Sequence, residues 1–411
     1  MASSTSRQTR ISINMSKTFD SLKPTQTWTQ PQTFVVRTEE DLKPVQELID
    51  ADKVARFFDT MDLAADELYD IDYPHEKDVP KKEKTAYKDF TAKHAWPWGT
   101  FVYFPWDRTL VRFPDQAELR ALRTSRNRNL ITAEEQQKLY GTTIMVAGLS
   151  VGSNIVEAMV SMGIGGKFVV ADMDIIEPSN LNRIRAPYHD VGAHKADAIA
   201  MRMGQIDPYV QFELYRNGVD EKNLLEMLDK HKPDVIVDEM DQIQLKIKLR
   251  REAQKRGIAV LSAADDGDSA LLDIERYDLQ PDYTPYHGLI PSDVLSYLET
   301  ATGIPRQALG VLIGKYFVGS KNIPLRMFKS LAEVSKTLPS WPQLGGAATQ
   351  SGIAIAYAAR RIILGQKLNA GRYVIGPDQV LDADLDDPDH RAELEAFQSQ
   401  LDSFELPAAK S

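Results

Sequence analysis

The sequence predicts an α/β protein, built on a doubly wound and mostly parallel β-sheet with helices on both faces and preceded by a small α-rich N-terminal extension. From residue 142 onward, short apolar runs alternate with helical runs, as in parallel βαβ units. The apolar runs lack a polar face, as expected for strands that are covered on both sides. A glycine-containing turn joins the first of these strands to the first helix.

The alternation continues regularly through five strands. Each apolar run has the length of a strand, and each intervening run repeats its apolar residues at helical spacing. This regularity predicts a Rossmann-like domain, and a late apolar helix is expected to pack beside it. Strands are expected at 142–148, 167–174, 210–216, 234–241 and 258–264, and helices at 150–163, 194–207, 221–231, 244–257 and 344–365.

The chain outside this domain divides by composition. Residues 1–35 are rich in Ser, Thr and Gln and predict a flexible arm. Residues 36–115 are interpreted as an extension subdomain, because residues 39–70 show helical spacing and aromatic residues concentrate after them. Residues 116–380 are assigned to the main domain, and residues 381–411 to an acidic tail with one helix.

Composition excludes several classes of protein. The chain of 411 residues has no cysteine, which removes disulfides, thiolate metal sites and a cysteine nucleophile. Its net charge of −10 does not favour nucleic acid as a partner. No apolar run reaches the roughly 20 residues that span a bilayer. The N-terminus lacks the apolar core of a signal peptide, so a cytoplasmic location is expected.

The turn after the first strand is a candidate phosphate loop. Gly148, Ser150 and Gly152 lie between strand and helix, where free backbone N–H groups can bind a phosphate. Asp172 ends the second strand and is placed to accept hydrogen bonds from a ribose, with Asp174 beside it. A tight turn without a ligand explains the loop equally well, and Asp174 can be read as a solvated carboxylate. These residues do not distinguish NAD from ATP.

Three polar residues after the second strand favour ATP. Asn180, Arg183 and Lys195 form a cluster that nucleotidyl transfer needs, because negative charge shifts onto the pyrophosphate and the α-phosphoryl oxygens. Asp241 follows the fourth strand, at the sheet edge where ligands of such folds bind. It is the candidate Mg²⁺ ligand, although a carboxylate there can also cap the next helix.

Five segments together resemble one protein family. They are RNRN at 126–129, GLSVGS at 148–153, DMDIIEPSNLNR at 172–183, GAHK at 192–195 and VDEMD at 237–241. The pattern resembles the ubiquitin-activating-enzyme-like superfamily, and in particular its ThiF/MoeB/HesA adenylyltransferase branch. The late helix at 344–365 also resembles that family, and the match covers a little under half of the chain.

The resemblance implies a role for each matching residue. Asp172 would hold the ribose, and Asn180 would contact phosphate or metal. Arg183 and Lys195 would grip the triphosphate of ATP, and Asp241 would bind Mg²⁺. The implied reaction joins ATP to a carboxylate and releases pyrophosphate, which leaves an acyl-adenylate.

The resemblance also implies partners. The carboxylate would be the C-terminus of a ubiquitin-like or sulfur-carrier protein, or that of a peptide. Family members are typically homodimers in which an N-terminal arginine reaches the partner's ATP, and Arg128 matches that residue. Without the resemblance, Arg128 reads as part of a solvated basic helix start.

The chain departs from the family pattern in three ways. Ser150 and Val151 stand where the family prefers glycines, and Gln242 stands where it usually has Asn. The absence of cysteine means that the enzyme cannot form a thioester, so the adenylate is expected to pass to an external nucleophile. The paired cysteines of the family's zinc site are also absent, and no structural zinc is expected.

Other interpretations remain open at this stage. The same chemistry can act on a small-molecule or tRNA-borne carboxylate, and an NAD-dependent oxidoreductase or a nucleotide-binding scaffold are further alternatives. The acidic and then aromatic region 262–290 could line an acyl-acceptor channel after the last strand of the sheet, but the preferred interpretation of Asp265, Asp266 and Asp268 is a solvated turn. His287 is left out of the site, because a lone histidine is more often a structural hydrogen-bonding group.

Overall fold

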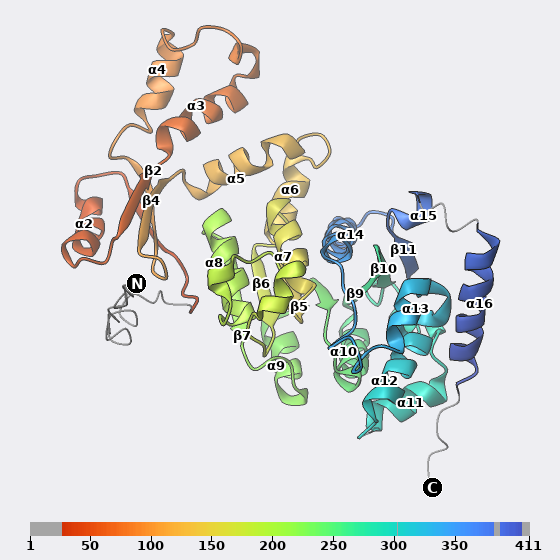
Figure 1. Ribbon diagram of the computed structural model, residues 1–411. Helices are drawn as coiled ribbons and strands as arrows, with labels where there is room; N and C mark the ends of the chain where they lie inside the picture. The colour runs from red at the N-terminus through yellow and green to blue at the C-terminus, as the bar shows by residue number, and fades with distance from the viewer. Residues whose placement is uncertain (1–26, 302, 382–386, 405–411) are drawn as a thin grey trace, which may run out of the picture.

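The computed structural model describes residues 27–301, 303–381 and 387–404 (Figure 1). A seven-stranded sheet lies in the middle of the molecule, a four-stranded sheet lies at its N-terminal end, and a group of helices lies at its C-terminal end. Within these described ranges, none of the helices combines the length and the apolar character needed to span a bilayer.

The large sheet confirms the predicted fold class. Its strand order is β11-β10-β9-β8-β5-β6-β7, and the five strands from β9 to β7 are parallel. Two antiparallel strands, β10 and β11, extend one edge. The strands are β5 (Thr143–Ala147), β6 (Lys167–Ala171), β7 (Gln211–Tyr215), β8 (Val235–Asp238), β9 (Ala259–Asp266), β10 (Ser269–Glu275) and β11 (Gly371–Ile375).

Helices cover both faces of this sheet because its strands are apolar on both sides. In β5, Ile144 and Val146 belong to one hydrophobic core, and Met145 and Ala147 belong to the other. The first core contains α7 (Gly152–Ser161), α8 (Lys195–Ile206) and α14 (Gly345–Ile363). The second contains α9 (Glu221–His231) and α10 (Ile243–Arg256).

The N-terminal extension contains a sheet as well as helices, so the prediction of an α-rich subdomain was incomplete. The strand order is β1-β3-β4-β2, and only β2 and β4 are parallel. The run over 39–70 was wrongly read as helical throughout, because its phenylalanines lie in a short strand. The elements are β1 (Gln32–Val36), α2 (Lys43–Asp50), β2 (Arg56–Asp59), α3 (Met61–Asp72), α4 (Thr85–Ala92), β3 (Gly99–Phe104) and β4 (Thr109–Phe113).

The segment expected to be a flexible arm is ordered in its described part. Trp28 is buried against Trp106 and Phe212, and its backbone N–H donates to the Asp197 carboxylate at 2.6 Å. That anchor and β1 contradict the predicted flexibility of residues 27–35. Residues 1–26 lie outside the described residues.

The remaining helices lie before and after the large sheet. Thr132 and Glu135 form a capping box at the start of α6, which satisfies backbone N–H groups of that helix. The C-terminal helices include one π-helical segment, η7. The bounds are α5 (Gln116–Thr124), α6 (Ala133–Tyr140), α11 (Ser292–Thr300), α12 (Arg306–Leu312), η7 (Ile313–Gly319), α13 (Leu325–Leu331), α15 (Asp378–Leu381) and α16 (Pro388–Asp402).

A glycine allows two strand ends to meet. Gly148 follows β5 with a φ of +93°, and a β-carbon there would lie 2.2 Å from the carbonyl oxygen of Glu239, which follows β8. Residues other than glycine rarely adopt this φ, and no β-carbon fits at that distance. The glycine loop and the segment after β8 are therefore in direct backbone contact.

We predict that Gly148→Ala is more destabilising than Gly192→Ala. Both glycines have a φ of +93°, but a β-carbon on Gly192 would meet nothing within 4 Å. The control therefore carries only backbone strain of about 1–2 kcal/mol, whereas Gly148→Ala adds a backbone clash worth about 2 kcal/mol more. Chemical denaturation measures both free energies of unfolding, and equal losses would show that the close approach is not fixed.

Candidate active site

The carboxyl ends of β5, β6 and β8 border one cavity of about 880 Å³. Lys195 and Asp241 line the same cavity, as a shared phosphate site requires. Gly152 and Arg128 are not among the residues that line it. The predicted residues that line it are Gly148, Ser150, Asp172, Asp174, Asn180, Arg183, Lys195 and Asp241.

Asp172 holds the glycine loop against the second strand. One carboxylate oxygen accepts a hydrogen bond from the Leu149 N–H at 2.7 Å, and the other accepts from the Asp174 N–H at 2.8 Å. The side chain is buried at the end of β6. The carboxylate predicted to hold a ribose thus also fixes the path of the loop. Its remaining lone pairs are available to a further donor.

Lys195 is the buried cation of the site. It begins α8, and its Nζ donates to Asp174 Oδ2 at 2.8 Å and lies 3.9 Å from Asp172 Oδ1. Asp174 is more than half exposed, so its pairing with Lys195 is one that a phosphate can replace at small cost. From the sequence, Asp174 could be a ribose ligand or a solvated carboxylate. In the structure it pairs with Lys195.

Arg183 contacts the loop where the sequence departs from the family pattern. Its Nε donates to Ser150 Oγ at 3.0 Å, so the serine gives the arginine a partner that glycine lacks. Asn180 is buried, and its Oδ1 accepts from the Glu177 N–H at 3.1 Å. This contact closes the short helical turn before Arg183 and thereby positions the arginine at the cavity.

Asp241 projects into the cavity from the segment after β8. Its side chain is exposed, and among the described residues it has neither a hydrogen bond nor an ion pair. The described residues contain no group of three or more His, Cys, Asp or Glu side chains that could hold a metal. One free carboxylate beside a phosphate site nevertheless fits Mg²⁺, which keeps most of its waters and binds substrate phosphates.

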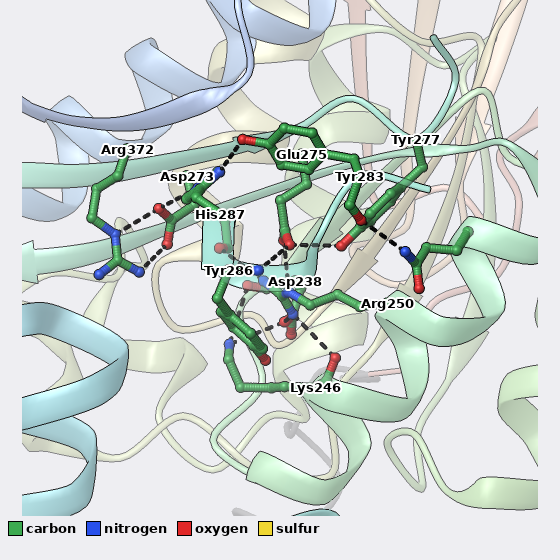
Figure 2. A network of polar contacts seen from close by, with 12 residues as sticks. Asp238, Lys246, Arg250, Asp273, Glu275, Tyr277, Tyr283, Tyr286, His287 and Arg372 are labelled. Atoms are coloured by element: carbon green, nitrogen blue, oxygen red, sulfur yellow. Dashed lines mark hydrogen bonds and ion pairs between the residues drawn. The ribbon is translucent and has the colours of Figure 1, made fainter. Parts of the chain in front are cut away.

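A buried ion network supports the segment that carries Asp241 (Figure 2). Arg250 is fully buried and donates to Asp238, the last residue of β8, and to Glu275 Oε2 at 2.6 Å. Lys246 Nζ donates to the Met240 carbonyl at 3.0 Å and lies 3.2 Å from Asp238 Oδ2. This network was not predicted from the sequence, although a charged helix residue facing an apolar strand is a signal for such a partner.

The ion pairs of the network lower the pKa of Asp238. Burial acts to raise this pKa, but the positive charges of Lys246 and Arg250 outweigh burial and hold the pKa below its ordinary value. Removal of one charged side chain would leave its partners buried without an opposite charge. This destabilises the folded protein far more than the loss of an ion pair that is exposed to water. The end of β8 is thus held in place by electrostatic pairing as well as by the sheet.

His287 belongs to a second paired group outside the nucleotide residues. Its Nε2 lies 3.0 Å from Asp273 Oδ1, and its Nδ1 lies 2.8 Å from the Tyr283 hydroxyl (Figure 2). Asp273 also accepts from Arg372 at 2.7 and 2.8 Å. Within the described part of the chain, the two ring nitrogens of His287 are thus engaged by Asp273 and Tyr283.

The interpretation of Asp265 and Asp266 as a solvated turn was wrong. Both lie on β9 and line the cavity, and Asp266 is only 2% exposed. Burial raises the pKa of Asp266 to about 7, and nearby Asp378 contributes to the increase. Burial also raises the pKa of Asp265 to about 6, against the lowering effects of Ser351 and Arg183. Only Asp268, at the tip of the turn, is exposed.

Arg128 does not reach the cavity of its own chain. It is exposed, and the neighbouring Asn127 donates to Gln136 Oε1 at 3.0 Å and to the Met162 carbonyl at 3.2 Å. Met162 follows α7, whose other end is at the glycine loop. The RNRN segment therefore lies near the sheet edge opposite the cavity.

The fold and the cavity together define a class of protein. A doubly wound sheet carries a glycine loop, an acidic strand end, and two cations at its carboxyl edge, where ligands of α/β folds bind. The sequence profile of the ThiF family matches residues 124–285, which include the glycine loop, the acidic strand end and the two cations. This part of the chain is therefore similar to the ThiF family of the ubiquitin-activating-enzyme-like superfamily.

Relatives were found by sequence and by structure. The uncharacterized protein MT1398 of Mycobacterium tuberculosis is 38% identical over 291 residues, which cover 70% of this chain and 39% of the relative. The tRNA threonylcarbamoyladenosine dehydratase of Bacillus subtilis is 30% identical over 34% of this chain and 55% of its own length. The chain therefore spans about half or less of these two relatives.

A search of solved structures found a further similar protein. The tRNA N6-threonylcarbamoyladenosine dehydratase of E. coli, in complex with ATP, has a TM-score of 0.42 and 18% identity. The match covers 60% of this chain and 95% of that protein.

We predict that Asp266→Asn becomes more stabilising as the pH rises. The folded-state pKa of about 7 lies above the usual value of 3.8, so the folded protein holds a proton that the unfolded chain releases. The wild type accordingly loses free energy of unfolding between about pH 4 and pH 7, and the variant lacks that loss. Denaturation at pH 5 and pH 8 should show the difference between variant and wild type growing by about 1–3 kcal/mol.

The matched control is Asp268→Asn, which removes the same charge from the exposed tip of the β9–β10 turn. Its effect on the free energy of unfolding should be small and nearly independent of pH. A pH-independent effect of Asp266→Asn would contradict the raised pKa.

Proposed function

We propose that the chain is an ATP- and Mg²⁺-dependent adenylyltransferase that activates a carboxylate as an acyl-adenylate and releases pyrophosphate. The observation that supports this most strongly is the placement of Arg183, Lys195 and Asp241 around one cavity beside the glycine loop. An oxidoreductase needs no such set of cations and a free carboxylate. Phosphoryl chemistry does, because charge develops on the phosphate oxygens in the transition state.

In the proposed reaction the substrates supply the reacting groups, and the protein positions them. A carboxylate oxygen attacks the α-phosphorus, the new C–O–P linkage forms, and the bond to pyrophosphate breaks. The carboxylate is already ionised at neutral pH, so no general base is needed. The protein positions the two reactants and stabilises charge, which are the main contributions available to it in phosphoryl transfer.

Each side chain has a task in this scheme. Asp172 accepts hydrogen bonds from the ribose while keeping the loop in place. Lys195 exchanges Asp174 for a phosphate oxygen, and Arg183 turns from Ser150 toward the triphosphate. Asp241 would hold Mg²⁺, which would supply positive charge to offset the negative charge of the phosphates. Asn180 fixes the turn before Arg183 and lies within the same cavity.

The fate of the adenylate follows from composition. Without a cysteine the chain has no thiol to form a thioester, so the acyl group passes directly to an external nucleophile. The carboxylate would be the C-terminus of a ubiquitin-like or sulfur-carrier protein, or of a peptide. A relative in Haloferax volcanii, named a SAMP-activating enzyme E1, is 29% identical over 32% of this chain, which supports a carrier protein. A tRNA-borne carboxylate is the alternative favoured by the named function of the B. subtilis relative.

The proposed assembly is a homodimer. Arg128 is exposed and absent from the cavity of its own chain, which supports a role for it at the ATP site of the partner subunit. In that position it would add a further positive charge to the triphosphate.

We expect Lys195→Ala and Asp241→Asn each to lower ATP–pyrophosphate exchange by about a hundredfold or more, because each removes transition-state stabilisation. Exchange would be measured with a panel of carrier proteins, peptides and small acids. Circular dichroism and the melting temperature would establish that both variants fold.

Two variants at exposed positions serve as controls. Lys230→Ala and Asp268→Asn change the same charges away from the nucleotide residues and should leave exchange unchanged. Full exchange activity in both Lys195→Ala and Asp241→Asn would overturn the proposal.

A further inference from the structure

The cavity continues past the nucleotide residues into a compartment between the β9–β10 hairpin and the C-terminal helices. In the antiparallel register, Asp266 pairs with Ser269, Ala264 with Leu271, and Ser262 with Asp273. Residues paired in this way point to the same face of the sheet. The floor of the compartment is therefore one face of the hairpin, and its cavity-lining members are Ser262, Ala264, Asp266, Leu271 and Asp273.

The opposite wall is apolar and comes from the segment around η7 and α13. The wall is seated on the hairpin turn, because the Gly267 N–H donates to Met327 Sδ at 3.0 Å. π-Helical turns such as η7 occur frequently at functional sites, where they displace side chains from regular helical positions. The cavity-lining side chains of this wall include Phe317, Val318, Ile323, Met327 and Trp341.

One carboxyl oxygen on this face lacks a hydrogen bond among the described residues. Asp266 is 2% exposed, and its buried Oδ2 is that oxygen. On the same face Arg372 and His287 engage Asp273, whereas the buried Oγ of Ser269, which pairs with Asp266 across the hairpin, likewise has no hydrogen bond to a described residue. A buried carboxyl oxygen without a donor is unfavourable, and a ligand that supplies a donor removes that penalty. Asp266 therefore needs a donor that the described part of the chain does not supply.

We propose that this compartment binds a substrate amine, with its ammonium group against Asp266 and its apolar part against Met327 and Trp341. This assignment of a substrate class rests on the proposed adenylyltransferase function. Ammonium matches a carboxylate in charge and donates several hydrogen bonds. The apolar wall selects amines that carry a hydrocarbon or aromatic group over bare ammonium or polyamines.

The surrounding charges favour a cation. Asp265 on β9 and Asp378 on α15 add negative charge near Asp266. The cations facing the compartment are already paired, Arg250 with Asp238 and Glu275, and Lys246 with Asp238. Burial and Asp378 raise the pKa of Asp266 to about 7, so ammonium binding near neutral pH converts the neutral carboxyl to carboxylate and releases a proton.

Calorimetric titration with phenethylammonium chloride at pH 8 tests the proposal, with 2-phenylethanol as the neutral analogue. We expect the wild-type chain to bind the ammonium about tenfold or more tightly than the alcohol. Asp266→Asn should lose that preference, whereas Asp268→Asn should retain it. Equal affinity of the wild type for both probes, absence of ammonium binding, or an unchanged preference in Asp266→Asn would each overturn the proposal.

A second measurement needs no variant. Titration at pH 6.5 in two buffers of different ionisation enthalpy reports the protons released on binding. We expect release with the ammonium and none with the alcohol, and absence of release would contradict the role of Asp266. Binding of Mg·ATP is measured separately, so a failure of the amine site is distinguishable from a failure of the nucleotide site.

The amine could belong to the acyl substrate or to a separate acceptor. ATP–pyrophosphate exchange with phenylalanine and with 3-phenylpropionate separates the two, because these acids differ only by the ammonium group. Exchange stimulated by phenylalanine alone assigns the amine to the acyl substrate. Absence of that difference, with phenethylammonium bound as above, assigns it to an acceptor.

Discussion

The close approach of two backbone segments is the constraint on which the site depends. Only a residue without a β-carbon fits at Gly148, because the carbonyl of Glu239 occupies that space. The turn after β5 and the segment after β8 therefore meet at the carboxyl edge of the sheet. Asp172 secures the first by accepting from the Leu149 N–H, and the glycine loop and Asp241 consequently border one cavity. The phosphate site and the metal site that we propose therefore lie in the same cavity.

Charged side chains near the carboxyl edge of the sheet are fully paired in one region and incompletely paired in another. Beneath the segment after β8, Arg250 is matched by Asp238 and Glu275 in a closed network, which suits a scaffold (Figure 2). Along the cavity itself, Lys195 and Arg183 have partners that a phosphate can replace, and Asp266 lacks a donor among the described residues. Groups without a permanent partner destabilise the folded chain, and the paired charges of the core offset that loss. The groups along the cavity can therefore remain available to ligands.

Much of this arrangement could be predicted from the sequence. The alternation of strands and helices predicted the large sheet, since buried parallel strands are apolar without interruption. Asp172, Lys195 and Asp241 follow predicted strands in the sequence, and this order predicted that they lie at one edge of the sheet. The four-stranded N-terminal sheet was missed, because strands as short as Arg56–Asp59 show no clear period between helices. Asp266 was misread because acidic residues beside a glycine normally indicate a solvated turn, and its burial depends on α13, which is distant in sequence.

A crystal structure of the chain with Mg²⁺ and α,β-methylene-ATP would test whether one cavity holds both phosphate and metal. We expect the triphosphate between Lys195 and Asp241, with the glycine-loop N–H groups facing the phosphates and Mg²⁺ bound to the Asp241 carboxylate. A nucleotide bound elsewhere, or one whose phosphates point away from both side chains, would contradict it.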